Sequence, residues 1–390
     1  MTSLRWMTAG ESHGPALVAI VEGVPAGLAL EAAQIDADLA RRQKGYGRGG
    51  RMKIERDRVE LIAGVRNGET IGSPIALQIA NKDFENWRGR MGPERFEVAP
   101  EPVTLPRPGH ADLAGALKYD RRDARDILER ASARETAART AAGAVARALL
   151  LAAGVEVCSR VRSIAGVFDP SEPSVDELFD GRATIEASEL RVLSPSIEQP
   201  MREAILERAH AGDTAGGTIE VVARGVLPGL GSHAQWDRRL DGRIAQAMLS
   251  VQAIKAVEIG DGWSAADWPG SAVHDPIGYD SSNRRFARTS NHAGGLEGGM
   301  SNGEPIVVRA AMKPIATLRS KLPSADLHSK IAALAAHERS DVCAVPAAAV
   351  VLEAALCLVL ATALLEKHGG DSMGELLRNV ARYKSQLEEY

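Results

Sequence analysis

The chain has 390 residues and a formal net charge of −4, with 45% apolar and 25% charged residues. This composition excludes collagen-like and wholly disordered chains, and the negative charge argues against a general nucleic-acid binder. At roughly 150 residues per domain, the length allows two or three domains or one large one. Of the 47 basic residues, 37 are Arg and 10 are Lys. This bias suits phosphate and carboxylate ligands, although high-GC codon usage would produce it as well.

Residues 4–30 mix short β-branched runs with Gly and Pro, which predicts a strand, a loop at 11–14 and a second strand. Residues 31–44 predict a helix, because Ile35 and Leu39 stand four apart among Ala, Asp and Arg. A Gly-rich loop at 45–50 then leads into alternating strands.

Residues 120–153 predict one long helical region, whose small residues let other elements approach closely. A polar surface segment at 171–198 follows. Further on come strand-like sequence at 214–231, a helix at 241–257, a Gly-, Ser- and Asn-rich region at 261–303 and a strand at 305–314. Gly-linked antiparallel strands interspersed with helices predict the α+β class.

Residues 342–365 are almost wholly apolar and long enough to span a bilayer. Glu353 lies in their middle and alanine dominates, so we predict a buried helix and no membrane span. The three cysteines form no CxxC pair, which favours reduced thiols, and the first residues lack the apolar core of a signal peptide. Both observations predict a cytoplasmic protein.

Familiar ligand motifs fail on their context. Residues 45–50 match GxGxxG, but they follow a predicted helix and open a strand, whereas a dinucleotide site follows a strand and opens a helix. The chain has no Gly-Lys dipeptide for a phosphate-binding P-loop and no HExxH, and its nine His show no ligand spacing, so we expect no metal.

Arginines and histidines instead gather on Gly- and Pro-rich loops. If these segments converge, they form a site for a substrate with several negative charges, with the histidines as proton donors near neutral pH. Arg130 and Arg134 stand four apart, on one face of the predicted helix. The clusters comprise Arg41, Arg42, Arg48 and Arg51; Arg107 and His110; Arg130, Ser132 and Arg134; and Arg339 with Asp341, besides His13 in GESHG.

Eight segments together resemble the chorismate synthase family, in one order along almost the whole chain. They are GESHG (10–14), RRQKGYGRGGRM (41–52), RPGHADLAGALKY (107–119), ERASARET (129–136), VQAIKAVEIGDG (251–262), NHAGGLEGGMSNG (291–303), AAMKPIAT (310–317) and ERSDVCAVPAA (338–348). The resemblance implies anti-1,4 elimination of phosphate from 5-enolpyruvylshikimate 3-phosphate to give chorismate, the last step of the shikimate pathway. Reduced FMN is required although the reaction has no net redox change.

The resemblance also implies roles for individual residues. His13 is expected at the leaving phosphate, His110 at the flavin, and Asp341 as the carboxylate that assists proton removal, with Ser12 and Ser132 as proton relays. The substrate anions are expected to bind Arg42, Arg48, Arg51, Arg107, Arg134 and Arg339. The expected FMN contacts are Arg130, Ala131, Ser132, Gln252, Ala253, Gly298, Lys313, Pro314, Ile315, Ala316, Thr317 and Arg339.

The fold that the resemblance implies is a β-α-β sandwich, a single domain over residues 1–390 with helices between antiparallel sheets, assembled as a homotetramer. Members of the family differ in whether they reduce their own flavin with NADPH. The lack of a recognisable reductase segment favours a separate flavin reductase here, with no nucleic-acid or membrane partner.

Two other functions use the same arginines. One is a flavin- or pyridine-nucleotide-dependent oxidoreductase with a polyanionic substrate, which the context of the GxGxxG segment disfavours. The other is an anion- or RNA-binding module, which leaves His13, His110 and Asp341 without a purpose and lacks stacking residues, since aromatics are only 4%.

Overall fold

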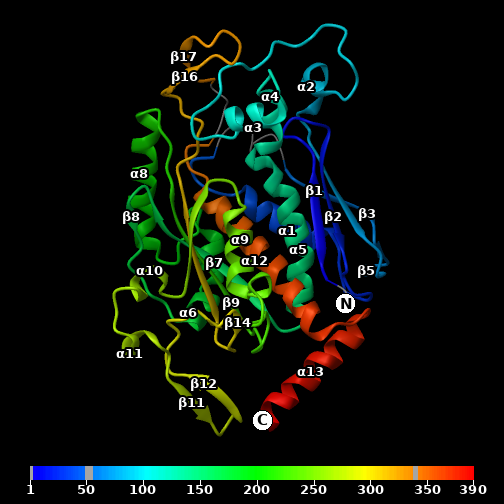
Figure 1. Ribbon diagram of the computed structural model, residues 1–390, viewed down its shortest axis with the longest axis vertical. Coiled ribbons are helices and arrows are strands. Elements are labelled where there is room, and N and C mark those ends of the chain that lie inside the picture. Colours follow the sequence, from blue (N-terminus) through cyan, green and yellow to red (C-terminus); the bar gives the residue numbers. More distant parts are fainter. Residues whose placement is uncertain (1–2, 49–55, 337–340) are drawn as a thin grey trace.

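Two antiparallel sheets enclose a layer of helices in the computed structural model, which describes residues 3–48, 56–336 and 341–390 (Figure 1). The first sheet has the order β1-β2-β6-β3, formed by Arg5–Ala9, Ala16–Glu22, Ile75–Ala80 and Val59–Ala63. The second has the order β10-β15-β9-β7-β8, formed by Ile254–Ile259, Ile306–Met312, Gly217–Arg224, Glu156–Ile164 and Val167–Phe168.

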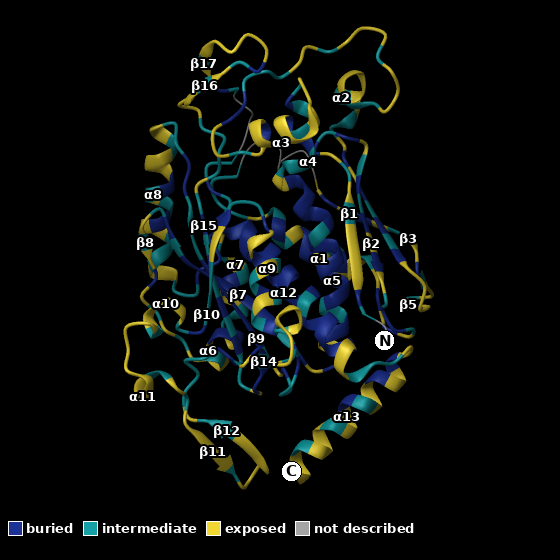
Figure 2. Ribbon diagram, in the orientation of Figure 1, coloured by how far each residue is buried: buried dark blue, intermediate teal, exposed yellow. Residues whose placement is uncertain are grey.

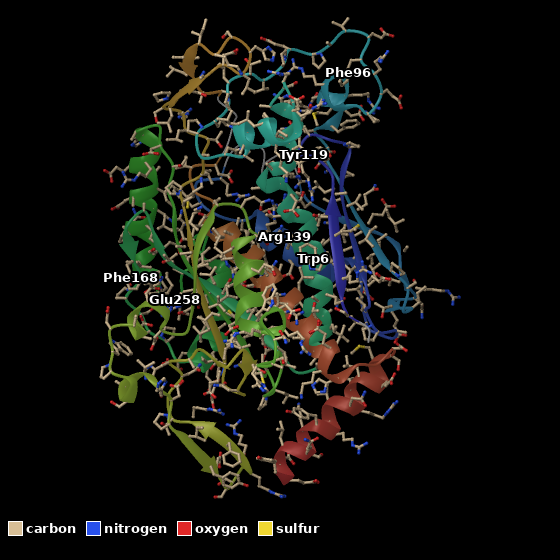
Figure 3. All side chains as sticks on the ribbon, viewed as in Figure 1. Trp6, Phe96, Tyr119, Arg139, Phe168 and Glu258 are labelled. Carbon is tan, nitrogen blue, oxygen red and sulfur yellow. The ribbon has the colours of Figure 1, made fainter. Side chains whose placement is uncertain are left out.

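Four helices fill the space between the sheets: α1 (Ala32–Gln43), α5 (Thr136–Ala152), α9 (Leu240–Leu249) and α12 (Val345–His368). Helix α5 packs on β1, β2 and β6, whereas α12 packs on β7 and β9 of the other sheet. Arg139 of α5 lies beside Trp6 of β1, with its guanidinium 5.6 Å from the ring centroid (Figure 3). The α+β class with helices between antiparallel sheets is therefore confirmed.

The inner faces of the sheets follow from the alternation of apolar residues. Leu17, Ala19 and Val21 of β2 are buried and stand opposite Ile79, Leu77 and Ile75 of β6. Because successive strand residues point to opposite faces, this register puts all six on the helix side. The buried residues accordingly concentrate in the central layer (Figure 2).

Helix α12 is apolar on nearly every side and lies in the centre of the molecule. Its length and composition would allow it to cross a membrane, yet 94% of its most apolar 18-residue stretch is buried inside the protein. A helix that is apolar all round needs such an environment, so the predicted buried helix is confirmed.

Small residues let α5 and α12 approach each other closely. A Cβ built on Gly143 of α5 would lie 2.3 Å from Cβ and 2.6 Å from Cα of Ala354 in α12. The helix backbone itself blocks that space, so only glycine fits there.

One buried carboxylate joins the central helices to the second sheet. Glu353 of α12 accepts from Arg41 of α1 at 2.8 Å, Arg147 of α5 at 2.5 Å, Arg191 at 3.2 Å and the Ser159 hydroxyl of β7 at 2.5 Å. Burial alone would raise the pKa of the Glu353 carboxyl, but the three guanidinium charges outweigh it and hold that pKa well below its usual range. The group is therefore ionised inside the core.

The structure corrects the prediction of one helix over 120–153. The chain forms α4 (Arg125–Ala131), leaves helical geometry at Ser132 with ψ 142°, and resumes through a 3-10 turn, η2 (Ala133–Glu135), into α5. The Ser132 hydroxyl accepts from the N–H of Arg134 and so caps the N-terminus of η2. Alanine-rich sequence predicted helix here, but a single capping serine divides it.

The helix predicted over 241–257 is also too long, because α9 ends at Leu249 and residues from Ile254 form β10. The polar segment 171–198 holds short helices that bury Leu178, Phe179 and Ile185, so it is only partly surface. A final amphipathic helix, α13 (Met373–Glu389), was not predicted.

The remaining elements are short. The helices are α2 (Phe84–Met91), α3 (Asp112–Tyr119), α6 (Val175–Asp180), α7 (Arg182–Ala187), η3 (Pro195–Ile197), α8 (Glu198–His210), η4 (Trp236–Arg238), α10 (Gly262–Ala265) and α11 (Gly270–Val273). The strands pair as hairpins: β4 (Val65–Arg66) with β5 (Glu69–Thr70), β11 (Ile277–Asp280) with β12 (Arg285–Arg288), β13 (Leu296–Glu297) with β14 (Met300–Ser301), and β16 (Pro323–Ala325) with β17 (Ala332–Leu334).

A Gly→Ala substitution inside a helix normally stabilises the protein, but the close approach of Ala354 at Gly143 predicts that it is destabilising here. Gly143→Ala should lower the free energy of unfolding by about 1–3 kcal/mol, the usual cost of overpacking. The matched control is Gly89→Ala in α2, where a Cβ meets no described atom within 4 Å. The control should be neutral or stabilising by up to about 1 kcal/mol. Urea unfolding measures both, and equal effects would contradict the close approach of α5 and α12.

Candidate active site

The loop between β1 and β2 is fixed from two sides. Its Ser12 N–H donates to the carbonyl of Glu129 in α4 at 3.0 Å. The Asn81 amide donates to the carbonyls of Glu11 at 3.1 Å and Gly14 at 2.8 Å. The strand-loop-strand prediction is confirmed, and the GESHG segment becomes a rigid turn.

His13 of this loop lies between a carboxylate and an aromatic ring. Its Nδ1 is 2.9 Å from Oε2 of Glu129, which is buried, and its ring stacks on Trp87 of α2 with centroids 4.0 Å apart. Arg125 pairs with the same glutamate at 2.8 Å.

Next to this loop, two buried arginines share one aspartate. Arg134 binds both oxygens of Asp57 at 2.6 and 2.7 Å and donates to Asn81 at 3.0 Å. Arg42 lies 3.5 Å from Asp57 and donates to the Thr136 hydroxyl at 2.9 Å. Since Asn81 also holds the 11–14 loop, His13 and these arginines belong to one connected region.

A third cation extends the cluster. Arg48 pairs with Asp341 at 3.1 Å, and both charges act on Arg42. Burial, together with the nearby Arg134 and Arg48, lowers the pKa of the Arg42 guanidinium to about 10. Its main opposing charge is Asp57. The region thus concentrates positive charge that a polyanion would satisfy.

The 107–112 segment forms a second, tightly paired group. Arg107 donates through Nε and a terminal nitrogen to the two oxygens of Asp112 at 2.8 and 3.1 Å. Nδ1 of His110 lies 2.5 Å from the same carboxylate, which is fully buried. Burial alone would raise the pKa of Asp112, but the His110 and Arg107 contacts hold it well below its usual range.

The residues expected at a flavin lie beside this group. Lys313 donates through Nζ to the Gly109 carbonyl at 3.1 Å and through its N–H to the Ala253 carbonyl at 2.9 Å. Burial, with the nearby Lys255, lowers the pKa of Lys313. Gln252 donates to Glu135 at 3.2 Å, and among the described residues its buried Oε1 has no partner.

Arg130 and Arg134 do not share a helix face as predicted, because the break at Ser132 separates them. Arg130 turns to β1, donating to the carbonyls of Gly10 at 3.1 Å and Thr8 at 2.9 Å. Arg134 turns to Asp57 instead. Arg41 also leaves the cluster and enters the core at Glu353.

Gly298 lies apart from the other expected flavin contacts. Its hairpin neighbour Gly299 accepts from the N–H of Leu240, which begins α9, whereas Gln252 follows the end of α9. Ten helical residues span about 15 Å, so α9 separates the two positions within one chain.

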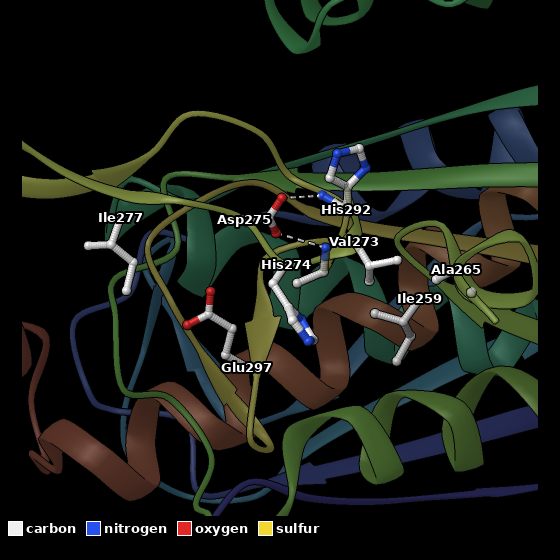
Figure 4. Close-up of a pocket in the computed structure, with 10 residues that line it drawn as sticks. Ile259, Ala265, Val273, His274, Asp275, Ile277, His292 and Glu297 are labelled. Carbon is white, nitrogen blue, oxygen red and sulfur yellow. Dashed lines mark hydrogen bonds between the residues drawn. The ribbon is translucent and has the colours of Figure 1, made fainter. Parts of the chain in front are cut away.

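A cavity of about 460 Å3 lies on the same side as Gly298, lined among others by His274, Asp275, His292 and Glu297 (Figure 4). Asp275 there binds the Ser290 hydroxyl and the N–H groups of His292 and Ala293. The residues that line this cavity lie between 259 and 297, in a part of the molecule away from α3 and α4 (Figure 1).

The described candidates therefore form two neighbouring groups. The first contains Ser12, His13, Arg42, Arg48, Arg134 and Asp341; the second contains Arg107, His110, Gln252, Ala253 and Lys313, with which the 313–317 segment begins. Ala131, Ser132 and Arg130 lie at the junction of α4 and η2. Arg51 and Arg339 lie outside the described residues.

Sequence reasoning missed the acceptors that hold these groups. Glu129 and Asp112 lie inside the ERASARET and RPGHADLAGALKY segments, close in sequence to an Arg or a His. This proximity could have identified them as acceptors for the site. Asp57, Asn81 and Trp87 belong to no motif and have no such signal.

Two loop histidines beside an arginine cluster define an enzyme site for a substrate with several negative charges, on an α+β scaffold. A family model described as chorismate synthase matches residues 4–365. The chain is 53% identical to the chorismate synthase of Trichlorobacter lovleyi over 99% of this chain and 100% of the relative. It is 56% identical to that of Geotalea uraniireducens, with the same coverage.

A crystal structure of a chorismate synthase superposes with a TM-score of 0.81 at 43% identity, covering 100% of this chain and 99% of that one. The chain belongs to the chorismate synthase family. Its activity is that of a phosphate-eliminating lyase at the final step of the shikimate pathway. The oxidoreductase and the RNA-binding alternatives are thereby set aside.

The Asp112 pairing predicts a pH-dependent stability difference. Asp112→Asn should cost about 3 kcal/mol at pH 7, because a buried ion pair loses its anion. A carboxylate with a depressed folded pKa stabilises above its unfolded pKa of about 3.9 and loses this effect as pH falls towards the folded value. The difference from the unmodified protein should thus be constant down to about pH 4 and shrink below it. Urea unfolding at several pH values measures it.

The exposed Asp237→Asn is the control and should change little at any pH. A difference between Asp112→Asn and the unmodified protein that stays constant below pH 3 would contradict the ionised pairing.

Proposed function

We propose that the chain converts 5-enolpyruvylshikimate 3-phosphate into chorismate by anti-1,4 elimination of phosphate, with reduced FMN and no net redox change. One observation carries this proposal. Two histidines, His13 and His110, each bind a buried carboxylate through Nδ1, and buried arginines belong to the same two groups of residues. Such a site offers both anion binding and proton transfer.

The substrate carries one phosphate and two carboxylates, and the arginines supply matching cations. Arg42, Arg48 and Arg134 are held by Asp57 and Asp341, so their charges are fixed in place before a ligand binds. Preorganised donors spend little energy on reordering when the anion arrives. Arg51, Arg107 and Arg339 are proposed to complete the substrate contacts.

Proton transfer is assigned to the loop residues. His13 donates a proton to the departing phosphate, while His110 faces the flavin and Asp341 assists removal of the substrate proton. Ser12 and Ser132 relay protons. The pairing of Arg48 with Asp341 supports these roles, since it places an acceptor beside the anion-binding arginines.

The residues expected at FMN fit a flavin. The buried Oε1 of Gln252, which has no partner within the described part of the chain, can accept from a ring N–H, and the Lys313 amine and the Arg130–Ser132 junction offer polar contacts. Ala131, Ala253, Pro314, Ile315, Ala316, Thr317 and Arg339 are proposed to line the same site. Reduced FMN supplies transient electron density to the substrate ring when bound.

Assembly and location are proposed on separate grounds. The main hydrophobic cluster runs from Leu4 to Val380, which supports one domain over residues 1–390. Helix α9, about 15 Å long, separates Gly298 from Gln252, and we propose that a second copy supplies its Gly298 to the flavin, in line with a homotetramer. We further propose a cytoplasmic enzyme whose FMN is reduced by a separate reductase, with NADPH only as an ultimate source of electrons.

Counting products per flavin tests the function. In a sealed anaerobic cell without NADPH, one charge of reduced FMN should support many turnovers, because substrate and product differ only by phosphate and a proton. Oxidised FMN should give none. The measurement is phosphate released per reduced flavin. A ratio held at one would mean that the flavin is consumed, and would overturn the proposal.

Dilution tests the proposed assembly. At micromolar concentration the mass in solution should be that of four chains. Activity per chain should fall at concentrations where single chains appear and return on reconcentration, because the flavin site of a single chain lacks the Gly298 proposed to come from a second copy. Light scattering and activity measured at matched concentrations check this. A fully active single chain would contradict it.

A further inference from the structure

Glu129 of α4 contacts the His13 loop through both its side chain and its backbone. Its Oε2 accepts from the backbone N–H of His13 at 2.9 Å, and both oxygens lie within hydrogen-bond distance of Nδ1, at 2.9 and 3.0 Å. Its own carbonyl accepts from the N–H of Ser12 at 3.0 Å. Only 2% of its surface is exposed, so the contacts are shielded from water.

The carboxylate at this position stays ionised. Burial alone would raise the pKa of Glu129, but its contacts with His13 and the charge of Arg125 outweigh burial and lower that pKa. An ionised carboxylate can only accept hydrogen bonds. Nδ1 of His13 must therefore carry a hydrogen in both protonation states of the ring, and only Nε2 can gain or lose one.

A second restraint fixes the plane of the ring. Trp87 stacks on His13 with the two planes 25° apart, and its indole N–H donates to Asp83 at 3.1 Å. Arg125 lies over the other ring, 5.1 Å from the Trp87 centroid, while it pairs with Glu129. The imidazole is thus held at its edge by Glu129 and on its face by Trp87.

We propose that Glu129 is the positioning residue for His13, selecting the Nδ1–H tautomer, and that Trp87 holds the ring in plane so that Nε2 serves as the acid. This inference rests on the proposed role of His13. The proton on Nε2 passes to an oxygen of the leaving phosphate. The ring becomes neutral with Nδ1–H still bound to Glu129, which keeps its charge throughout.

The tautomer can be read without any activity. In protein labelled with 15N-histidine, the neutral His13 ring should show a protonated Nδ1 and a bare Nε2, assigned by comparison with His13→Ala. In Glu129→Gln the side-chain amide places a donor near Nδ1, so the Nε2–H tautomer should appear. A bare Nδ1 in the unmodified protein would overturn the inference even if no variant folds.

Kinetics with reduced FMN give the second readout. Glu129→Gln should lower kcat roughly 10²-fold, within the range for general acid–base groups, while the substrate KM stays near its original value because Glu129 is assigned no substrate contact. Adding Glu129→Gln to His13→Ala should cost nothing further, since the residue acts only through His13. A further loss in the double variant would indicate a merely structural role and overturn the proposal.

Two pairs of variants complete the design. Trp87→Phe keeps a stacking ring and should retain most of kcat, whereas Trp87→Ala should lose it; equal rates would remove Trp87 from the proposal. Glu203→Gln in α8, an exposed site, and His233→Ala in an exposed loop should change neither readout. Suppose that His13→Ala keeps full activity while the unmodified protein shows the Nδ1–H tautomer. This result would refute the role of His13 but leave its pairing with Glu129 standing.

Discussion

The buried charge of Glu353 constrains the rest of the molecule. A lone carboxylate in that position would be far too costly, so the arginines of α1, α5 and the 191 loop must reach it together. Their convergence fixes how the central helices lie against each other and against β7. Arg41 and Arg42 are neighbours in α1, so the helix end that binds Glu353 also presents Arg42 to Asp57. The core ion cluster and the arginine cluster proposed to bind substrate are therefore joined through α1.

The arginine bias of the sequence has a structural use. Asp112 binds the Arg107 guanidinium through both of its oxygens, one to Nε and one to a terminal nitrogen, a geometry that a lysine amine cannot reproduce. Codon usage alone would scatter arginines over the surface, whereas Arg42, Arg107 and Arg134 are buried. Each of these arginines has an acidic partner within the protein, so the site keeps its shape when no substrate is bound.

Sequence patterns predicted the elements whose signal is local and repeated. The apolar run of α12, the spacing of Ile35 and Leu39 in α1, and the turn that carries His13 all follow from neighbouring residues. The break at Ser132 and the change to strand at Ile254 depend instead on capping and on pairing with β15, which no periodicity encodes. The acceptors Asp57 and Asn81 were missed for the same reason, because they meet Arg134 only after folding.

Helix α2 buries no residue, and Trp87 is its inward contact with the active-site loop. Lifting it away exposes little apolar surface and breaks no part of the central layer, so its opening costs far less than unfolding. Amide hydrogens of α2 should accordingly exchange with solvent long before those of α5. Movement of α2 would leave the contacts between Glu129 and His13 in place, because Glu129 belongs to α4.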